Sequence, residues 1–222
     1  MREIVLDTET TGFEYAGDDR IVEIGCIELV NHVPTGRFFQ RYVNPQREMS
    51  EGARNVTGIT DEFLADKPLF ADVADDFLDF IGDAPFVIHN AAFDIGFLNA
   101  ELGRLGREGF PMERAVDTVL IARRKFPGAP ASLDALCKRF DIDLSRRDKH
   151  GAVLDCELLA AVYLELLGGR QQGFALVRAG SIRVEARDKL IRPARPHAAS
   201  PEELEAHAAM IAEIKEAIWT AE

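Results

Sequence analysis

A short buried strand that ends in two acidic residues constrains this chain more than any other feature of its sequence. The chain begins MREIVLDTETTG, in which Ile4, Val5 and Leu6 form an apolar run that leads into Asp7 and Glu9. Side chains alternate between the two faces of a strand, so both carboxylates lie on one face, with their Cα atoms about 6 to 7 Å apart. Two like charges beside a buried strand need a neutralising partner. We therefore expect this strand end to belong to a polar site.

The first 169 residues alternate short strands with helices. The pattern predicts strands at 20–30, 36–43 and 85–88 and from residue 116, with a turn at 32–35. It predicts a short helix capped by Thr60 or Asp61, a helix that ends at 126, and helices at 71–81, 89–102, 132–140 and 152–167. The strand PFVI runs directly into the helical pattern HNAAFDIGFLNAEL. Such a succession is typical of an α/β layered fold.

The composition changes after Gly169, which together with Gly168 ends the last of these helices. Residues 170–199 are rich in arginine and interrupted by proline, which is typical of a linker. Residues 200–222 then predict a helix with Ser200 as its cap, Pro201 at its first position and Glu203 completing a capping box. Its apolar stripe contains Leu204, Met210 or Ile211, Ile214, Ile218 and Trp219. We predict three segments: a domain at 1–169, a basic linker at 170–199 and a docking helix at 200–222.

Charge and cysteine content limit the classes of function. The formal net charge of −12 argues against tight, sequence-independent binding of a long duplex, because such binding rests on a basic surface. It leaves room for a short nucleic-acid end held through metal ions. Cys26, Cys137 and Cys156 are odd in number and far apart, which predicts buried, inert thiols. The chain enters a strand at once, without a signal-peptide pattern or a membrane span, so we expect a cytoplasmic protein.

Two further acids occupy positions that face the interior of their predicted helices. Asp155 begins an apolar stripe whose later members are Leu158, Leu159, Val162 and Leu166. A solitary ionised carboxylate there costs several kcal/mol unless a cation or a metal ion pairs with it. Asp94 fits an exposed acid in the first turn of a helix, where the helix dipole favours negative charge. It also shares a helix face with Leu98 and Leu105. That face predicts an inward carboxylate.

His150 lies five residues before Asp155, which is about 140° around a continuous helix. Both face one site only if His150 lies on the preceding loop, with Gly151 supplying the bend. By itself, a histidine in RRDKHG also fits a solvated loop residue. Four inward carboxylates together with a histidine predict two divalent cations, Mg²⁺ or Mn²⁺, about 4 Å apart, as in-line phosphoryl displacement requires. His150 then fits a general base, because histidine titrates near neutrality.

Three segments, DTETTG, HNAAFDIGFL and HGAVLDCELLA, resemble the three motifs of the DEDDh 3′→5′ exonucleases, and they occur in the same order. Their spacing and the segment SLDALCKRF resemble the proofreading epsilon subunits of bacterial DNA polymerase III over residues 2–169. The resemblance implies an RNase H-like α/β fold, with a mixed five-stranded sheet flanked by helices. It implies that Asp7, Glu9, Asp94 and Asp155 are metal ligands and that His150 is the base. It further implies hydrolysis of the 3′-terminal nucleotide of DNA to a nucleoside 5′-monophosphate.

The same resemblance implies contacts to the terminal nucleotide. Backbone and hydroxyl groups of the first motif approach it, an aromatic ring packs near its sugar or base, and the loop segment VTGI contacts the base. The residues concerned are Thr10, Thr11, Gly12, Val56, Thr57, Asn90 and Phe93. Some relatives carry histidine in place of Thr57 and an acid in place of Gly52. These departures leave the core chemistry unchanged, and the resemblance does not define the nucleotide contacts at these two positions.

The tail resembles segments that join an exonuclease to a replication complex. The segment QQGFAL is similar to a sliding-clamp-binding peptide with Gln171, Phe174 and Leu176 as anchors. The last helix, with Trp219, resembles the segment that docks on the polymerase alpha subunit, although it also fits a helix that folds back on its own domain. The resemblance also implies a small theta-like protein partner and a location at the replisome on the nucleoid.

The sequence leaves two alternative functions open. One is a free-standing exonuclease that trims RNA or repairs DNA. The other is a structural polymerase subunit with a decayed nuclease site, but the presence of all five site side chains argues against it.

Overall fold

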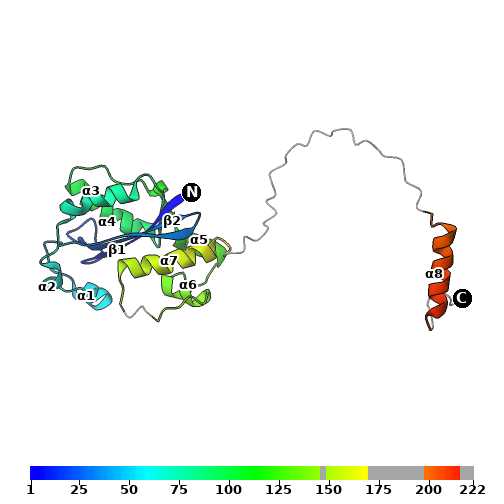
Figure 1. The fold of residues 1–222 in the computed structure, drawn as a ribbon. Coiled ribbons are helices and arrows are strands. Elements are labelled where there is room, and N and C mark those ends of the chain that lie inside the picture. Colours follow the sequence, from blue (N-terminus) through cyan, green and yellow to red (C-terminus); the bar gives the residue numbers. More distant parts are fainter. Residues whose placement is uncertain (146–148, 170–197, 216–222) are drawn as a thin grey trace. The chain divides into compact units, whose positions relative to one another are not determined.

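The computed structural model describes residues 1–145, 149–169 and 198–215. The chain divides into two compact units. Among the described residues, the first unit contains the strands and helices α1 to α7, and the second contains helix α8 (Figure 1). In the part of the chain that the structure describes, no helix combines the length and the apolar character needed to cross a bilayer.

Within the described residues, the first unit is built on a mixed sheet of five strands. They are β1 (Arg2–Thr10), β2 (Ile21–Val30), β3 (Val33–Tyr42), β4 (Phe86–Ile88) and β5 (Ala115–Asp117), in the order β3-β2-β1-β4-β5. The first three strands pair antiparallel, whereas β1, β4 and β5 run parallel. The predicted mixed five-stranded sheet is confirmed. Because β1 and β4 are parallel neighbours, their carboxyl ends meet at one edge of the sheet.

Helices cover both faces of this sheet (Figure 1). One face carries α3 (Phe70–Ile81) and α4 (Ala91–Arg104). The other carries α5 (Thr118–Lys125), α6 (Leu133–Arg139) and α7 (Ala152–Leu166). The short helices α1 (Glu51–Thr57) and α2 (Asp61–Leu64) pack around Val22 in a small third cluster, and a 3₁₀ turn (Met112–Arg114) leads into β5.

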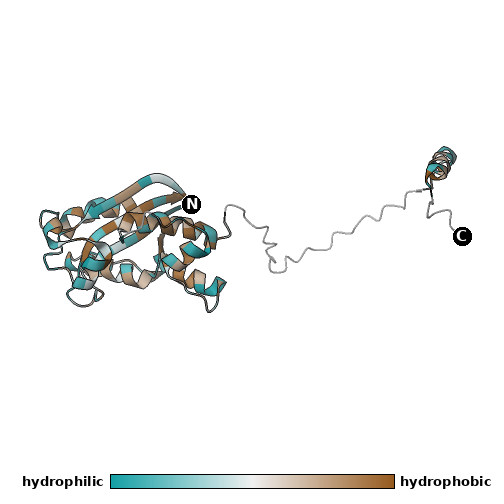
Figure 2. Cartoon of the chain, turned by 90° about the horizontal axis from the view of Figure 1, so that it is seen from below, coloured by the Kyte–Doolittle hydropathy of each residue, from teal (hydrophilic) through white to brown (hydrophobic). Residues whose placement is uncertain are grey.

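Strand alternation separates the two main apolar clusters. Ile4 and Leu6 of β1 pack with the α3–α4 side, whereas Val5 packs with the α5–α7 side. In Figure 2 the helices carry both apolar and polar residues, as expected of helices with one face on a sheet. The same alternation places Asp7 and Glu9 on the Val5 face, toward α7. The start of α7 therefore decides what these two carboxylates meet.

The three cysteines behave as predicted. All are buried and none is in a disulfide. Burial is the main reason why the pKa values of the Cys26 and Cys156 thiols are raised above their usual range. Both thiols therefore stay protonated at neutral pH and act as small apolar groups in the core.

The connection between β2 and β3 differs from the prediction. The turn was expected at 32–35, but β3 already begins at Val33, and Val30 pairs with Val33 across the hairpin. Asn31 and His32 form the two-residue turn, with φ angles of 51° and 66°. Two positive φ angles define the tight turn whose twist matches that of the strands. Pro34 is tolerated because β3 lies at the edge of the sheet.

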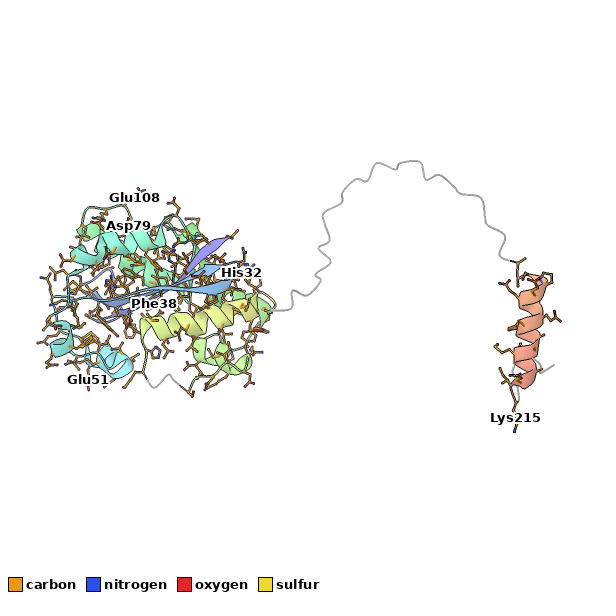
Figure 3. All side chains as sticks on the ribbon, viewed as in Figure 1. His32, Phe38, Glu51, Asp79, Glu108 and Lys215 are labelled. Carbon is orange, nitrogen blue, oxygen red and sulfur yellow. The ribbon has the colours of Figure 1, made fainter. Side chains whose placement is uncertain are left out.

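Two helices also differ from the prediction. The segment containing Val56 was expected to be a loop, but it ends helix α1, which Ser50 caps by accepting a hydrogen bond from the Ala53 N–H. Figure 3 labels Glu51 at the start of this helix. The terminal helix has the predicted Ser200 capping box, but it spans only Pro201–Glu213, and an extended backbone at residue 214 ends it. A short helix with no buried side chain has only local interactions to prolong it.

Candidate active site

The structure brings all five predicted catalytic side chains to one cavity. The cavity has a volume of about 250 Å³ and opens where β1 ends beside the first turns of α4 and α7. Strand β1 supplies two of the side chains, each helix supplies one acid, and the loop before α7 supplies the histidine. The five are Asp7, Glu9, Asp94, His150 and Asp155. Parts of the chain that are distant in sequence thus meet at one point, as predicted.

Asp94 points into the interior, which resolves the two interpretations of its position. It is 2% exposed, and Thr8 donates both its backbone N–H and its hydroxyl to Asp94 Oδ1, at 2.9 and 2.8 Å. Burial raises the pKa of Asp94 to about 7, although the two hydrogen bonds from Thr8 act in the opposite direction. Thr8 holds this carboxylate against the end of β1 and was not recognised in the sequence. Its position between the two acids of DTE was the available signal.

Asp7 lies at the centre of the negative charge. Burial is the first cause of its raised pKa, followed by the charges of Asp94, Glu9 and Asp155. The carboxyl therefore keeps its proton well above the ordinary range. Among the described residues that line the cavity, none is a lysine or an arginine that could offset the charge.

His150 lies on the loop before α7, as predicted, and its Nδ1 is 3.2 Å from Asp155 Oδ2. Asp155 is only 4% exposed, and the other members of its apolar stripe are buried, which confirms the prediction that this helix face points to the interior. The backbone N–H of His150 donates to the carbonyl of Val56 at 3.1 Å, so the end of α1 holds the loop in place. Side-chain atoms of Glu9, His150 and Asp155 approach within 4.8 Å of one another.

Two residues of β2 position the start of α7. Gly25 pairs with Asp7, and a Cβ atom there would lie 2.5 Å from the backbone carbon of Ala152, so only glycine lets the helix approach. Glu23 is buried, and its Oε2 accepts a hydrogen bond from the Ala152 N–H at 3.2 Å. Asp155 lies one turn further along this helix. Neither residue was predicted from the sequence. Glu23 could have been recognised as an acid within the apolar run RIVEIGCIELV.

Most of the predicted nucleotide contacts line the same cavity. They are Thr10, Gly12, Val56, Thr57, Asn90 and Phe93. Thr11 does not line it: its buried hydroxyl donates to Asp19 at 2.8 Å and accepts the Arg20 N–H at 3.0 Å. Phe13, Ala53 and His89 also line the cavity and were not predicted. The ring of Phe13, which is 78% exposed, lies 6.4 Å from the ring of Phe93.

The donor set of this cavity fits divalent cations. Four carboxylates converge from three elements. Burial raises the pKa values of Asp7 and Asp94, and repulsion by the other three carboxylates adds to the shift of Asp7. Carboxylate oxygens are the ligands that Mg²⁺ and Mn²⁺ prefer. Among the described residues that line the cavity, there is no lysine or arginine side chain that could replace such ions. The predicted partner contacts Gln171, Phe174, Leu176 and Trp219 lie outside the described residues.

Known proteins resemble this chain in sequence and in fold. The family model described as exonuclease matches residues 4–163. The DNA polymerase III epsilon subunit of Rickettsia felis is 55% identical over 180 residues, which cover 80% of this chain and 79% of that protein. The corresponding subunit of Escherichia coli K12 is 44% identical over 225 residues, which cover 95% and 92%.

Solved structures give the same result for the fold. Exonuclease X in complex with 5′ overhanging duplex DNA superposes with a TM-score of 0.60 at 28% identity, covering 74% of this chain and 90% of that one. The nuclease domain of 3′hExo, a DEDDh family member bound to rAMP, gives 0.64 at 19% identity and 75% and 91% coverage, which is a likeness of fold alone. Because the family model spans most of the first unit and the epsilon subunits match over more than two thirds of their length, this chain belongs to the exonuclease family and groups there with the DNA polymerase III epsilon subunits.

Proposed function

We propose that this chain hydrolyses the 3′-terminal nucleotide of a DNA strand and proofreads the product of a replicative DNA polymerase. The observation that carries the proposal is the meeting of Asp7, Glu9, Asp94, Asp155 and His150 in one cavity of about 250 Å³. The identity of 44 to 55% to epsilon subunits supports the role in replication. The role places the protein at the replisome in the cytoplasm.

The four carboxylates would hold two divalent cations, Mg²⁺ or Mn²⁺. When bound, such cations stabilise the negative charge that develops on the attacking and leaving oxygens of a phosphoryl displacement. Thr8 holds the Asp94 carboxylate in position through two hydrogen bonds. Glu23 and Gly25 hold the first turn of α7, and with it the carboxylate of Asp155, close to β1.

His150 is the proposed general base. Its side chain is about half exposed, at 44%, so it can reach a water molecule in the cavity mouth and accept its proton. Asp155, 3.2 Å from Nδ1, orients the ring and stabilises the imidazolium that forms. The resulting hydroxide oxygen bonds to the phosphorus, and the bond from phosphorus to the 3′ oxygen of the preceding nucleotide breaks. The 3′ oxygen takes a proton from solvent, and His150 returns its proton to solvent. The retained strand then ends in a 3′ hydroxyl, and a nucleoside 5′-monophosphate leaves.

The walls of the cavity suit a terminal nucleoside. Phe13 and Phe93 offer aromatic faces for a sugar or a base, and Val56 adds an apolar contact. Thr10, Thr57 and Asn90 add polar groups to the lining. A narrow cavity with such walls admits one unpaired nucleotide, so a mismatched end that frays reaches it more often than a paired end.

Replacement of His150 by alanine should lower kcat by roughly 10²- to 10⁴-fold, the usual contribution of a general base, and change KM little. The measurement is steady-state release of nucleotides from single-stranded DNA at saturating Mn²⁺. The matched control is His207→Ala, which alters an exposed histidine of α8. An effect of His150→Ala that is confined to KM contradicts the assignment of the base.

The partners proposed for the tail are based on the similarity of this chain to the epsilon subunits. Leu204 and Met210 of helix α8, and Ile214 directly after it, are exposed apolar side chains, which suits docking in a groove of the polymerase alpha subunit. Residues 171–176 are proposed to bind the sliding clamp, and a small theta-like subunit is a further proposed partner. Residues 1–169 are proposed to hold the complete exonuclease site, with 170–199 as the linker to the docking helix at 200–222.

The function is tested with two proteins, the full chain and a truncated chain of residues 1–169. Both should release nucleoside 5′-monophosphates from the 3′ end of labelled single-stranded DNA, and faster from a mismatched than from a matched primer end. Only the full chain should elute with the polymerase alpha subunit in gel filtration. Comparable rates on 3′-ribo and 3′-deoxy ends, together with no complex, would support a free-standing exonuclease instead.

A further inference from the structure

The carboxylate cluster borders other hollows as well as the nucleotide cavity. On the α5–α6 side, the described residues form a cavity of about 280 Å³ that Asp7, His150 and Asp155 also line. His89 and Ser132 connect this cavity to a groove of about 540 Å³, because they line both. We call the two together the α5–α6 groove. It leads from the carboxylates over the surface toward α5.

The carboxylates therefore lie between two spaces. Phe13, Val56 and Phe93 wall the nucleotide cavity, and none of them lines the α5–α6 groove. A phosphodiester under attack has one nucleotide on each side of its phosphorus. If the leaving nucleotide occupies the aromatic cavity, the groove is the space that receives the nucleotide retained on the strand. This step rests on the proposed function.

The far end of the groove carries a positive group. Arg123 lines it, is exposed, and forms no ion pair within the part of the chain that the structure describes. The nearby carboxylate of Asp117 accepts backbone N–H groups from Val119, Asn90 and Ala91 at 2.8 to 3.3 Å, so it is engaged with the protein itself. In a chain with a net charge of −12, an arginine with this exposure suits a ligand phosphate.

Other lining residues suit a nucleotide strand as well. Leu120 is 58% exposed and gives an apolar surface beside Arg123. The Ser132 hydroxyl accepts the Ala135 N–H at 3.3 Å, which leaves its own proton for an acceptor in the groove. The groove thus offers an apolar surface for a base, and a hydroxyl donor and a guanidinium for a phosphate, which suits a single strand.

We propose that the retained DNA strand leaves the active site along the α5–α6 groove and that Arg123 binds one of its phosphates. Arg123 is in this assignment a substrate-binding residue that determines affinity for strands longer than the terminal nucleotide. It does not act on the bond that is cleaved.

The test compares Arg123→Gln with Arg124→Gln, its exposed neighbour on α5 that lines neither part of the groove. The substrates are single-stranded oligodeoxynucleotides of two to eight residues and the p-nitrophenyl ester of thymidine 5′-monophosphate, which has no retained nucleotide. Arg123→Gln should raise KM for the longer oligonucleotides by about tenfold, the low end for a hydrogen bond to a charged group. It should leave the ester rate unchanged.

Salt dependence gives a second readout. The slope of log(kcat/KM) against log[salt] should become shallower by about 0.7 in Arg123→Gln, as for the loss of one phosphate contact to a single strand. Arg123→Lys should restore most of the affinity, and Arg124→Gln should match the wild-type enzyme in both readouts. An unchanged KM and slope in Arg123→Gln would overturn the proposed path, and so would an equal loss on the ester. Failure of the wild-type enzyme on every substrate would instead overturn the proposed function.

Discussion

Removal of divalent cations is expected to stop nucleotide release completely and to lower the thermal stability of the protein. The physical reason is the buried cluster of carboxylates, in which burial first, and then repulsion by the neighbouring carboxylates, raises the pKa of Asp7 well above its ordinary range. Cations that bind the folded state and not the unfolded chain add stability. At about 100 times their Kd they should raise Tm by roughly 5 to 10 °C.

The experiment measures both quantities on one preparation. The protein is treated with EDTA, dialysed, and returned to Mg²⁺, Mn²⁺ or Ca²⁺, and nucleotide release and Tm are recorded after each step. Return of Mn²⁺ should restore both. Nucleotide release that persists in EDTA would show that the cations are not needed for catalysis. A Tm that does not change with Mn²⁺ would show that the cations do not bind to the carboxylate cluster.

Replacement of a single carboxylate is expected to separate activity from stability. Asp7→Asn and Asp155→Asn should each lower kcat by at least roughly 10²- to 10³-fold, the usual effect of removing one group that stabilises developing charge. The metal-free Asp7→Asn protein should nevertheless have a higher Tm than the wild type at pH 8, because one buried charge is gone. The variants therefore become inactive while they remain folded.

The pH dependence of this stability difference follows from the sign of the shift. The pKa of Asp7 in the folded protein is raised above its ordinary value of 3.8, so the folded state holds this proton more tightly than the unfolded chain. Stability from the protonated carboxyl is fully present below pH 3.8 and is lost as the pH rises through the folded pKa. The gain in Tm of Asp7→Asn should thus be largest at pH 8 and shrink toward pH 4.

The control is Asp79→Asn, which removes an exposed carboxylate of α3 (Figure 3). It should leave kcat unchanged and show no comparable pH-dependent gain in Tm. If Asp7→Asn or Asp155→Asn keeps a near-normal kcat, the assignment of that carboxylate is wrong. If Asp7→Asn unfolds at a lower temperature than the wild type at pH 8 without metal, repulsion does not dominate the cluster.

Local patterns in the sequence predicted much of the site. Strand alternation put Asp7 and Glu9 on one face, and helical periodicity put Asp155 on a buried stripe, because both periods are properties of the backbone alone. The angle between His150 and Asp155 on a helix required a loop before α7, and the structure has one. The missed start of α1 and the misplaced hairpin turn depended on capping and on positive φ angles, which short-range composition indicates weakly.

Residue types and local periodicity were enough to identify the acidic side chains and the face of its element that each occupies, and the three motifs were enough to indicate the family to which the chain belongs. How those faces meet depends on tertiary packing. The hydrogen bonds from Thr8 to Asp94 join residues 86 positions apart, and the fit of Ala152 against Gly25 depends on a helix and a strand that pack without being neighbours in sequence. The α5–α6 groove arises in the same way. Periodicity repeats within a few residues, whereas convergence depends on strand pairing and packing across the whole domain, and these are global properties of the folded chain.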